Sequence, residues 1–131
     1  MSDVNIPDEL RYSKDHEWVK IEGDTAIVGI SDYAQQEMHE VVFVDVPKIG
    51  KVVKQKDALC VIETMKAVSD VLAPVTGEVI EVNASLKDKP ELVNSSPYDK
   101  GWIVKLKITG AVEEELKNLI DADAYRKHIG K

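Results

Sequence analysis

Short segments rich in Val and Ile fill the chain from about residue 12 to residue 108. Residues 16–21 (His-Glu-Trp-Val-Lys-Ile) alternate polar and apolar side chains as a half-buried strand does, and residues 102–108 repeat this pattern. Residues 40–46 are largely apolar, which also predicts a strand. The chain is therefore predicted to be mostly β over this region.

A first hairpin is predicted from residues 16–21 and 25–30, because a glycine-containing turn signal separates them. A short helix near residue 32 is predicted to follow and to run as far as Met38. Ser31 or Asp32 can cap this helix, since a serine or aspartate oxygen accepts a hydrogen bond from the first backbone N–H groups.

A second hairpin is predicted around Lys66. Residues 58–63 and 68–73 both read as strands, and the connection Thr64-Met65-Lys66-Ala67 contains neither glycine nor Asn-Gly. Turn formation alone therefore does not explain the residues of the connection. Met65 is apolar although it is placed at an exposed tip, which suits contact with another protein.

Residues 47–52 and 74–79 share a Pro-x-x-Gly-x-Val pattern, one before and one after this second hairpin. Common turn residues produce such a short repeat by coincidence, but its placement suggests two similar halves. With a further strand predicted at 78–82, the segments predict an all-β sandwich of two small antiparallel sheets.

The C-terminal region is predicted to be helical over about residues 112–129. Apolar residues recur there at helical spacing, with carboxylates in the first turn and cations near the end, as the helix dipole favours. Asp121 or Asp123 can break this helix or cap a second one. The length of 131 residues suits a single domain, 1–131, with a core of about 12–108 and this helical segment packed on it.

The charge balance argues against nucleic acid and against an anionic membrane surface as partners. Lys and Arg number 17 against 24 Asp and Glu, which gives a formal net charge of −7, whereas phosphate binding needs clustered positive charge. No segment has the apolar length of a membrane span, and the polar start resembles no targeting sequence. We expect a monomeric, cytoplasmic protein, or a mitochondrial matrix protein if a transit peptide has been removed.

The residue types that usually carry metal or thiol chemistry show no suitable pattern. His16, His39 and His128 lie far apart in different predicted elements, so no metal site is expected. Cys60 is the only cysteine and lies on an apolar strand, where it reads as a small buried hydrophobe. The two tryptophans are expected to anchor the core.

The segment Ile62-Glu63-Thr64-Met65-Lys66-Ala67 resembles the attachment hairpin of lipoyl and biotinyl carrier domains. Glu-Thr-Met-Lys leans toward the biotin pattern, but that pattern usually has a second Met where Ala67 stands. Taken alone, this motif does not separate the two cofactors.

The wider chain resembles the H protein family of the glycine cleavage system, in order from about Tyr12 to the C-terminal helix. The family more often has Ser-Val where Thr64-Met65 stand, and Gly where His39 stands. The stretches that carry the resemblance are His16–Val19, Gly29–Gln35, Glu40–Val44, Ser69–Val71, Ala73–Val79, Pro90–Tyr98 and Gly101-Trp102.

The resemblance implies a barrel-sandwich hybrid fold and a non-catalytic carrier with lipoate amide-linked to Lys66. It implies a pyridoxal-phosphate glycine decarboxylase, a tetrahydrofolate-dependent aminomethyltransferase and a dihydrolipoamide dehydrogenase as partners, and a lipoate ligase or lipoyltransferase that attaches the arm. The resemblance further implies that the carrier shuttles the aminomethyl group of glycine from the first enzyme to the second and is reoxidised by the third. Glu17 and Asp70 are candidates to hold the cationic amine by charge-assisted hydrogen bonds.

Four alternatives stay open at this point. A biotin carrier and a family variant that relays lipoate to other enzymes would use the same Lys66. An unmodified interaction domain would have Lys66 as a plain surface residue. A thiol enzyme would use Cys60, although nothing in the sequence nominates a base to activate it.

Overall fold

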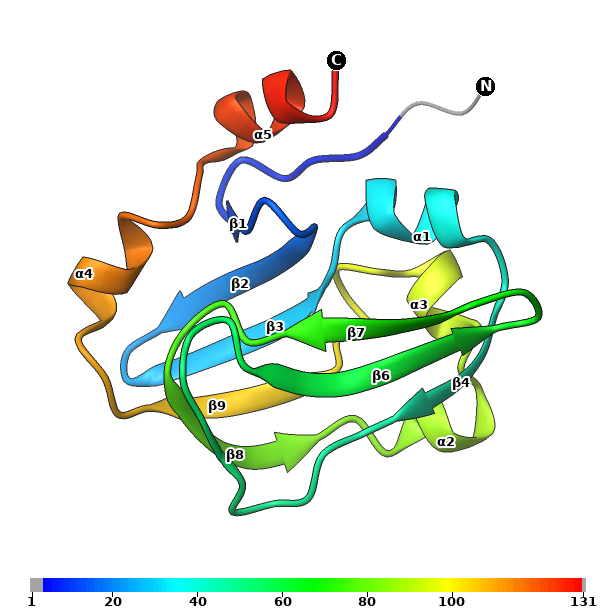
Figure 1. The fold of residues 1–131 in the computed structure, drawn as a ribbon, viewed down its shortest axis with the longest axis horizontal. Helices are drawn as coiled ribbons and strands as arrows, with labels where there is room; N and C mark the ends of the chain where they lie inside the picture. Colours follow the sequence, from blue (N-terminus) through cyan, green and yellow to red (C-terminus); the bar gives the residue numbers. More distant parts are fainter. Residues whose placement is uncertain (1–3, 131) are drawn as a thin grey trace.

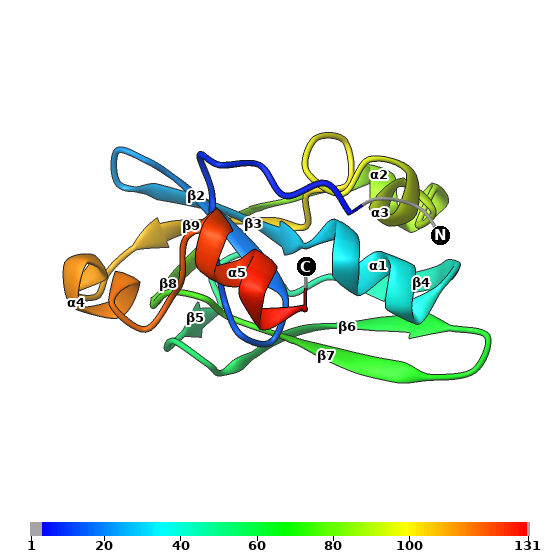
Figure 2. The same ribbon diagram turned by 90° about the horizontal axis from the view of Figure 1, so that it is seen from above.

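The computed structural model describes residues 4–130, and two antiparallel sheets form its centre (Figure 1). Seen from above, the smaller sheet lies as a separate layer beneath the larger one (Figure 2). Buried side chains of both sheets face each other, for example Val28 and Leu106 from the larger and Ile62 and Val71 from the smaller. Removing these aliphatic side chains from water is the main stabilising contribution to the fold.

Within the described residues the larger sheet has six strands and the smaller has three. In spatial order the larger sheet contains β1 (Arg11–Tyr12), β2 (Glu17–Glu22), β3 (Thr25–Ile30), β9 (Val104–Ile108), β8 (Gly77–Val82) and β5 (Val52–Val53). The smaller sheet contains β4 (Val41–Asp45), β6 (Ala58–Thr64) and β7 (Val68–Leu72).

The mostly β fold with two antiparallel sheets agrees with the sequence prediction, but the sheets are unequal and do not close into a barrel. The larger sheet ends at β1 and β5, and the smaller at β4 and β7. The two-residue strands β1 and β5 were not predicted, because two residues carry no periodic signal. The halves of the short repeat do lie side by side, since Val52 of β5 pairs with Glu78 of β8.

Both predicted hairpins are present. Strands β2 and β3 pair with Val19 opposite Val28, and Gly23 in their turn has a φ of +62°, which glycine adopts without a steric penalty. Strands β6 and β7 pair with Ile62 opposite Ser69, so the chain reverses close to Lys66 as predicted.

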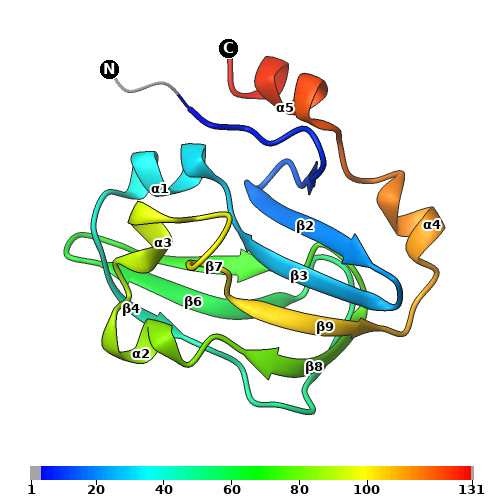
Figure 3. The same ribbon diagram turned by 180° about the vertical axis from the view of Figure 1, so that it is seen from behind.

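The helices are short and lie around the sheets. They are α1 (Asp32–Met38), α2 (Ser85–Asp88), α3 (Leu92–Ser95), α4 (Val112–Leu116) and α5 (Ala122–His128). Ser31 caps α1, because its hydroxyl oxygen accepts from the N–H of Ala34 at 3.1 Å. Viewed from behind, α3 lies against α1 and α2 against β4 (Figure 3). Both α2 and α3 lie in regions for which no helix was predicted.

The helical C-terminal segment is confirmed, but it is broken into two helices. Asp121 caps the second of these, since its carboxylate accepts from the N–H of Ala124 at 2.9 Å. Helix α5 packs through Tyr125, which stacks on Tyr12 with the ring centroids 4.6 Å apart. No helix among residues 4–130 has both the length and the apolar character needed to cross a membrane.

Candidate functional site

Lys66 lies at the exposed tip of the β6–β7 hairpin, where Thr64 shapes the turn. The N–H of Thr64 donates to the carbonyl oxygen of Ala67 at 2.9 Å, and the Thr64 hydroxyl oxygen accepts from the N–H of Ala67 at 3.2 Å. A threonine side chain therefore closes this glycine-free turn by bonding to nearby backbone.

The side-chain amine of Lys66 is exposed and unpaired. Among residues 4–130 it makes no ion pair and no hydrogen bond, and the residue is exposed together with Met65 and Ala67. An exposed turn that presents an unpaired amine is suited to covalent attachment of a carboxylic acid through an amide bond.

A cleft of about 650 Å³ begins beside this tip and runs between α1 and β7 toward the start of β2. In Figure 1, helix α1 lies above strand β7. The cleft is lined by Asp15, His16, Glu17, Ile30, Tyr33, Ala34, Glu37, Met38, Ala67, Ser69, Asp70, Val71 and Leu72.

Glu17 is a buried carboxyl group in the wall of this cleft. Only 3% of the residue is exposed. One carboxyl oxygen accepts from the Ser13 hydroxyl and the other accepts from the N–H of Leu72 at 3.1 Å. Burial raises the pKa of Glu17 to about 7, although these hydrogen bonds oppose the shift.

Asp70 lines the same cleft from β7 and is exposed. The tertiary structure therefore brings the two predicted carboxylates, 53 positions apart in the printed sequence, to one cleft that starts at Ala67. A cleft with two carboxylates beside an attachment point can hold a cation at the end of a flexible arm.

Sequence reasoning missed several other residues of the cleft. Tyr33 and Glu37 are four positions apart on α1, so their common face was readable once a helix was predicted there. Nδ1 of His16 forms a hydrogen bond with the Tyr125 hydroxyl at 2.8 Å, and burial lowers the pKa of His16. The sequence around His16 did not indicate this contact, because Tyr125 lies on α5, which is distant in the sequence.

The statement that the histidines lie far apart is wrong for one pair. The rings of His16 and His128 have centroids 5.7 Å apart, because α5 returns to the start of β2. Within residues 4–130, no three His, Cys, Asp or Glu side chains lie together in a way that could hold a metal ion.

Cys60 and Trp18 are both buried, as predicted. Burial raises the pKa of the Cys60 thiol to about 12, so the thiolate needed by a nucleophile is scarce at neutral pH. Trp18 donates from its ring N–H to the carbonyl oxygen of Pro97 at 3.0 Å. Trp102 is only half-buried, and Lys105 lies over its ring, 5.2 Å from the centroid.

Comparison with known proteins places the whole arrangement in one family. The model of the family described as glycine cleavage H-protein matches residues 10–131. The probable glycine cleavage system H protein of Thermococcus kodakarensis is 52% identical over 130 residues, which cover 98% of this chain and 96% of that protein. The glycine cleavage system H protein of Halothermothrix orenii is 46% identical over 126 residues, covering 96% and 97% respectively. A crystal structure of a glycine cleavage system H protein from Mycobacterium marinum matches with a TM-score of 0.85 at 32% identity, covering 96% of this chain and all (100%) of that one. The chain therefore belongs to the glycine cleavage H-protein family.

Proposed function

We propose that this chain is the lipoyl-bearing carrier of the glycine cleavage system, with lipoate joined to Lys66 by an amide bond. It would shuttle the aminomethyl group of glycine from the decarboxylase to the aminomethyltransferase, and dihydrolipoamide dehydrogenase would reoxidise it. The single observation that carries the proposal is the unpaired Lys66 amine at a hairpin tip that opens onto a carboxylate-lined cleft.

The residues around Lys66 fit a covalently attached arm. The amine is exposed on a turn held by Thr64, so the attached group can move while its anchor stays in place. The cleft that starts at Ala67 offers about 650 Å³ for part of that arm. When bound, lipoate supplies a dithiolane ring that accepts and releases the transferred unit, and this chemistry belongs to the cofactor and the partner enzymes.

We propose that Glu17 and Asp70 hold a cationic amine inside the cleft. The pKa of Glu17, about 7 while the cleft holds no cation, would fall when a cation enters, because an opposite charge nearby favours the ionised carboxylate. The buried wall of the cleft would at the same time limit the access of water to the transferred group.

The chain's own contribution is positioning and shelter, so we propose that it acts as a carrier without catalysing the reactions of its partners. Those partners are the pyridoxal-phosphate decarboxylase, the tetrahydrofolate-dependent aminomethyltransferase, the flavin-containing dehydrogenase and a lipoate ligase or lipoyltransferase. That residues 1–131 act as one monomeric carrier domain in the cytoplasm stays a prediction.

A lipoate-relay role is the second candidate, because it would use the same Lys66 and the same hairpin. A biotin carrier is favoured only by Met65. A biotin carrier would differ from the proposed function in the group attached to Lys66. A lipoate-relay protein would carry the same group but would pass it to the carrier domains of other enzymes.

The first experiment measures the intact mass of the protein purified from its own lipoate-replete cells, for the wild type and for Lys66→Arg. The expected result is a lipoyl mass shift in the wild type that disappears in Lys66→Arg, because arginine offers no amine for acylation. Lys56→Arg, another exposed lysine in a turn, serves as the control and should keep the shift. A biotinyl shift, or no shift in the wild type, would contradict the proposal.

The second experiment reconstitutes the protein with a glycine decarboxylase and follows glycine-dependent exchange of carbon dioxide. Lipoylated wild type should support exchange, whereas apoprotein and Lys66→Arg should not. Lipoylated wild type that supports no exchange but passes lipoate to another carrier domain would favour the relay role instead.

A further inference from the structure

Three large apolar side chains are exposed around the hairpin tip. The exposed fractions are 46% for Phe43, 84% for Met65 and 67% for Val68. Strand register places Phe43 opposite Glu63 and Glu63 opposite Val68, so Phe43, Glu63 and Val68 form one row on the outer face of the smaller sheet. Met65 follows this row at the tip of the hairpin. We call Phe43, Met65 and Val68 the hairpin patch.

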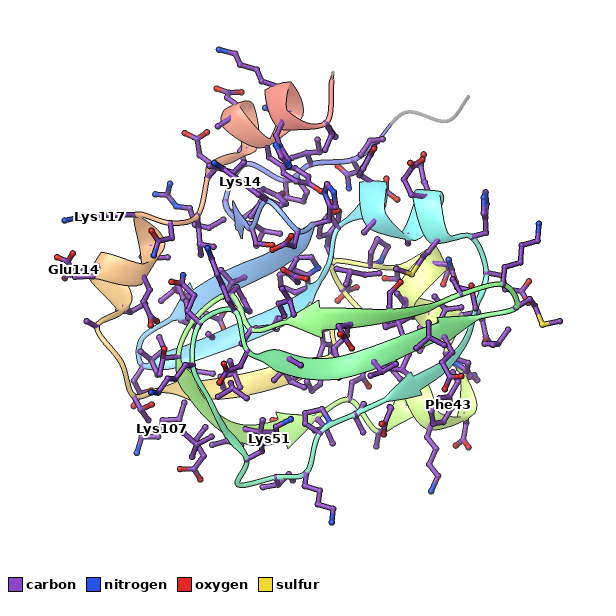
Figure 4. The ribbon with its side chains drawn as sticks, viewed as in Figure 1. Lys14, Phe43, Lys51, Lys107, Glu114 and Lys117 are labelled. Carbon is purple, nitrogen blue, oxygen red and sulfur yellow. The ribbon has the colours of Figure 1, made fainter. Side chains whose placement is uncertain are left out.

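The surroundings of the hairpin patch are acidic. In the neighbouring row of the same face, Asp45 lies opposite Val61 and Val61 lies opposite Asp70. Along the chain, Lys66 is the only Lys or Arg from Asp57 to Leu86. Lys51 lies at the opposite end of the smaller sheet from Phe43 (Figure 4), whereas Lys87 is on α2, which contacts β4.

We propose that the hairpin patch is the docking surface for the enzyme that acylates Lys66, and that this enzyme presents an apolar surface with a basic rim. This inference rests on the proposed function. Enzymes that act on the far end of a long arm can work at a distance from the tip, but an acylating enzyme must bring its active site to the lysine nitrogen itself. The residues next to Lys66 are therefore the ones that such an enzyme must contact.

The step that this docking serves is acyl transfer to nitrogen. The Lys66 ammonium loses a proton, and the free amine attacks the carbonyl carbon of an activated acyl donor, an adenylate or a thioester held by the enzyme. The amide C–N bond forms as the bond to the leaving group breaks. The leaving group departs as its anion with the electron pair, and the second nitrogen proton passes to solvent.

The charges favour a basic partner over a second copy of this chain. A symmetric dimer through the hairpin patch would bring Glu63, Asp45 and Asp70 of one copy close to the same carboxylates of the other. Like charges that face each other across an interface oppose association. A partner with Lys and Arg around an apolar centre would instead be attracted to this face.

Val68→Arg tests the docking surface, and Val52→Arg is a matched control. The two valines are 67% and 66% exposed and both lie on strands, but Val52 is on β5 of the other sheet. The assay uses apoprotein, lipoic acid, ATP and the purified lipoate ligase of the source organism. Val68→Arg should raise the KM for the apoprotein about tenfold or more, because it removes an apolar contact and repels a basic rim. Val52→Arg should stay within about twofold of the wild type.

A small acyl donor distinguishes lost docking from a damaged hairpin. An N-hydroxysuccinimide ester of octanoic acid acylates accessible amines without a protein surface, and it should label Lys66 equally in wild type, Val68→Arg and Val52→Arg. Equal labelling together with an unchanged KM for Val68→Arg would overturn the docking proposal while leaving Lys66 as the attachment site. Failure of the ligase to acylate wild-type Lys66 would instead count against the proposed function.

Size-exclusion chromatography tests whether a second copy of this chain, and not the acylating enzyme, binds the hairpin patch. Wild-type apoprotein should elute as a monomer at assay concentrations. A dimer that Val68→Arg dissociates and Val52→Arg does not would assign the hairpin patch to self-association and overturn the proposal.

Discussion

Glu17 combines a carboxyl group with near-complete burial, and these two properties oppose each other. Two hydrogen bonds partly compensate, but the loss of water still raises the pKa of Glu17 to about 7. A carboxyl group with this pKa exchanges its proton close to neutral pH. Glu17 can therefore gain or lose its proton near neutral pH, whereas a carboxyl group with the ordinary pKa of 4.5 would be ionised there.

The raised pKa makes stability depend on pH in a defined direction. The ordinary pKa of Glu17 is 4.5, so as the pH rises from 4.5 to about 7 the unfolded chain loses this proton while the folded chain keeps it. The wild type should lose stability over this range relative to Glu17→Gln, which cannot ionise. The difference in free energy of unfolding should grow by about 3 kcal/mol and level off above pH 7.

Urea denaturation between pH 4 and pH 8 measures this difference. Glu113→Gln, which changes an exposed carboxylate on α4, should run nearly parallel to the wild type. A Glu17→Gln curve that also runs parallel would mean that Glu17 has the same pKa in the folded and unfolded states.

His39 occupies a backbone conformation that suits glycine. It follows α1 with φ of 67° and ψ of −153°, a region that residues with a Cβ enter at a cost of about 1–3 kcal/mol. Its side chain is exposed, while its carbonyl oxygen accepts from the Asn94 side chain at 2.7 Å. Glycine would adopt this backbone conformation without the steric cost.

His39→Gly should therefore stabilise the protein, by roughly 1 kcal/mol, because it relieves the strain at the cost of a more flexible unfolded chain. His39→Ala keeps the Cβ and should leave stability almost unchanged. Thermal and urea unfolding of both variants check this, and equal stabilities for His39→Gly and His39→Ala would show that the backbone at this position carries no strain.

At the scale of elements, α5 supports the site from outside the sheets. Its Tyr125 is buried, and its hydroxyl group bonds to Ser31 at 2.7 Å and to His16 at 2.8 Å. Ser31 caps α1, so one hydroxyl of α5 links the start of α1 to the residue that precedes β2. Both α1 and β2 supply walls of the cleft.

Loss of the α5 cap should loosen this support. Asp121→Ala removes the hydrogen bond to the N–H of Ala124 and should cost about 1 kcal/mol. Asp123→Ala in the same turn removes only an exposed ion pair with Arg126 and should cost at most about 0.5 kcal/mol. Urea denaturation gives both values, and NMR of the His16 ring should report a change for Asp121→Ala alone. Equal costs for the two variants would contradict the capping role.

At the scale of the whole molecule, two sheets form a stable base from which the β6–β7 hairpin projects (Figure 1). Strands β3, β9 and β6 have neighbours on both sides, so their backbone groups are paired along two edges. At the tip, the N–H of Lys66 has only a long contact of 3.4 Å to the Thr64 hydroxyl. A rigid core with a solvent-exposed tip is what a carrier needs in order to meet several enzymes.

Hydrogen exchange should reproduce this division. Amides of β3, β9 and β6 should exchange most slowly, since they open only with the sheets, and amides of Met65 and Lys66 should exchange fastest among the hairpin residues. Mass spectrometry or NMR of the apoprotein measures both. Protection at Lys66 equal to that of β6 would mean that the tip is held by contacts absent from the structure.

Much of the fold was predictable because its signals are local. Alternating side chains predicted β2, and Ser31 marked the start of α1. The four-residue helices α2 and α3 escaped prediction, because one turn of helix is too short to establish a period. Glu17 was predicted as a candidate to hold a cationic amine, but its burial was not predicted. Segments that are distant in the sequence enclose it.

The amino-acid sequence by itself determined the paired strands, the turn that exposes Lys66, and the excess of negative charge. These depend on neighbouring residues, on backbone preferences, or on a simple count. Only the tertiary structure decided that Glu17 and Asp70 share a cleft, that Glu17 is dry enough to titrate near neutrality, and that Phe43 and Val68 lie in one row beside the tip. Each of these results from surfaces that meet when distant segments pack together, and no short stretch of sequence contains that information.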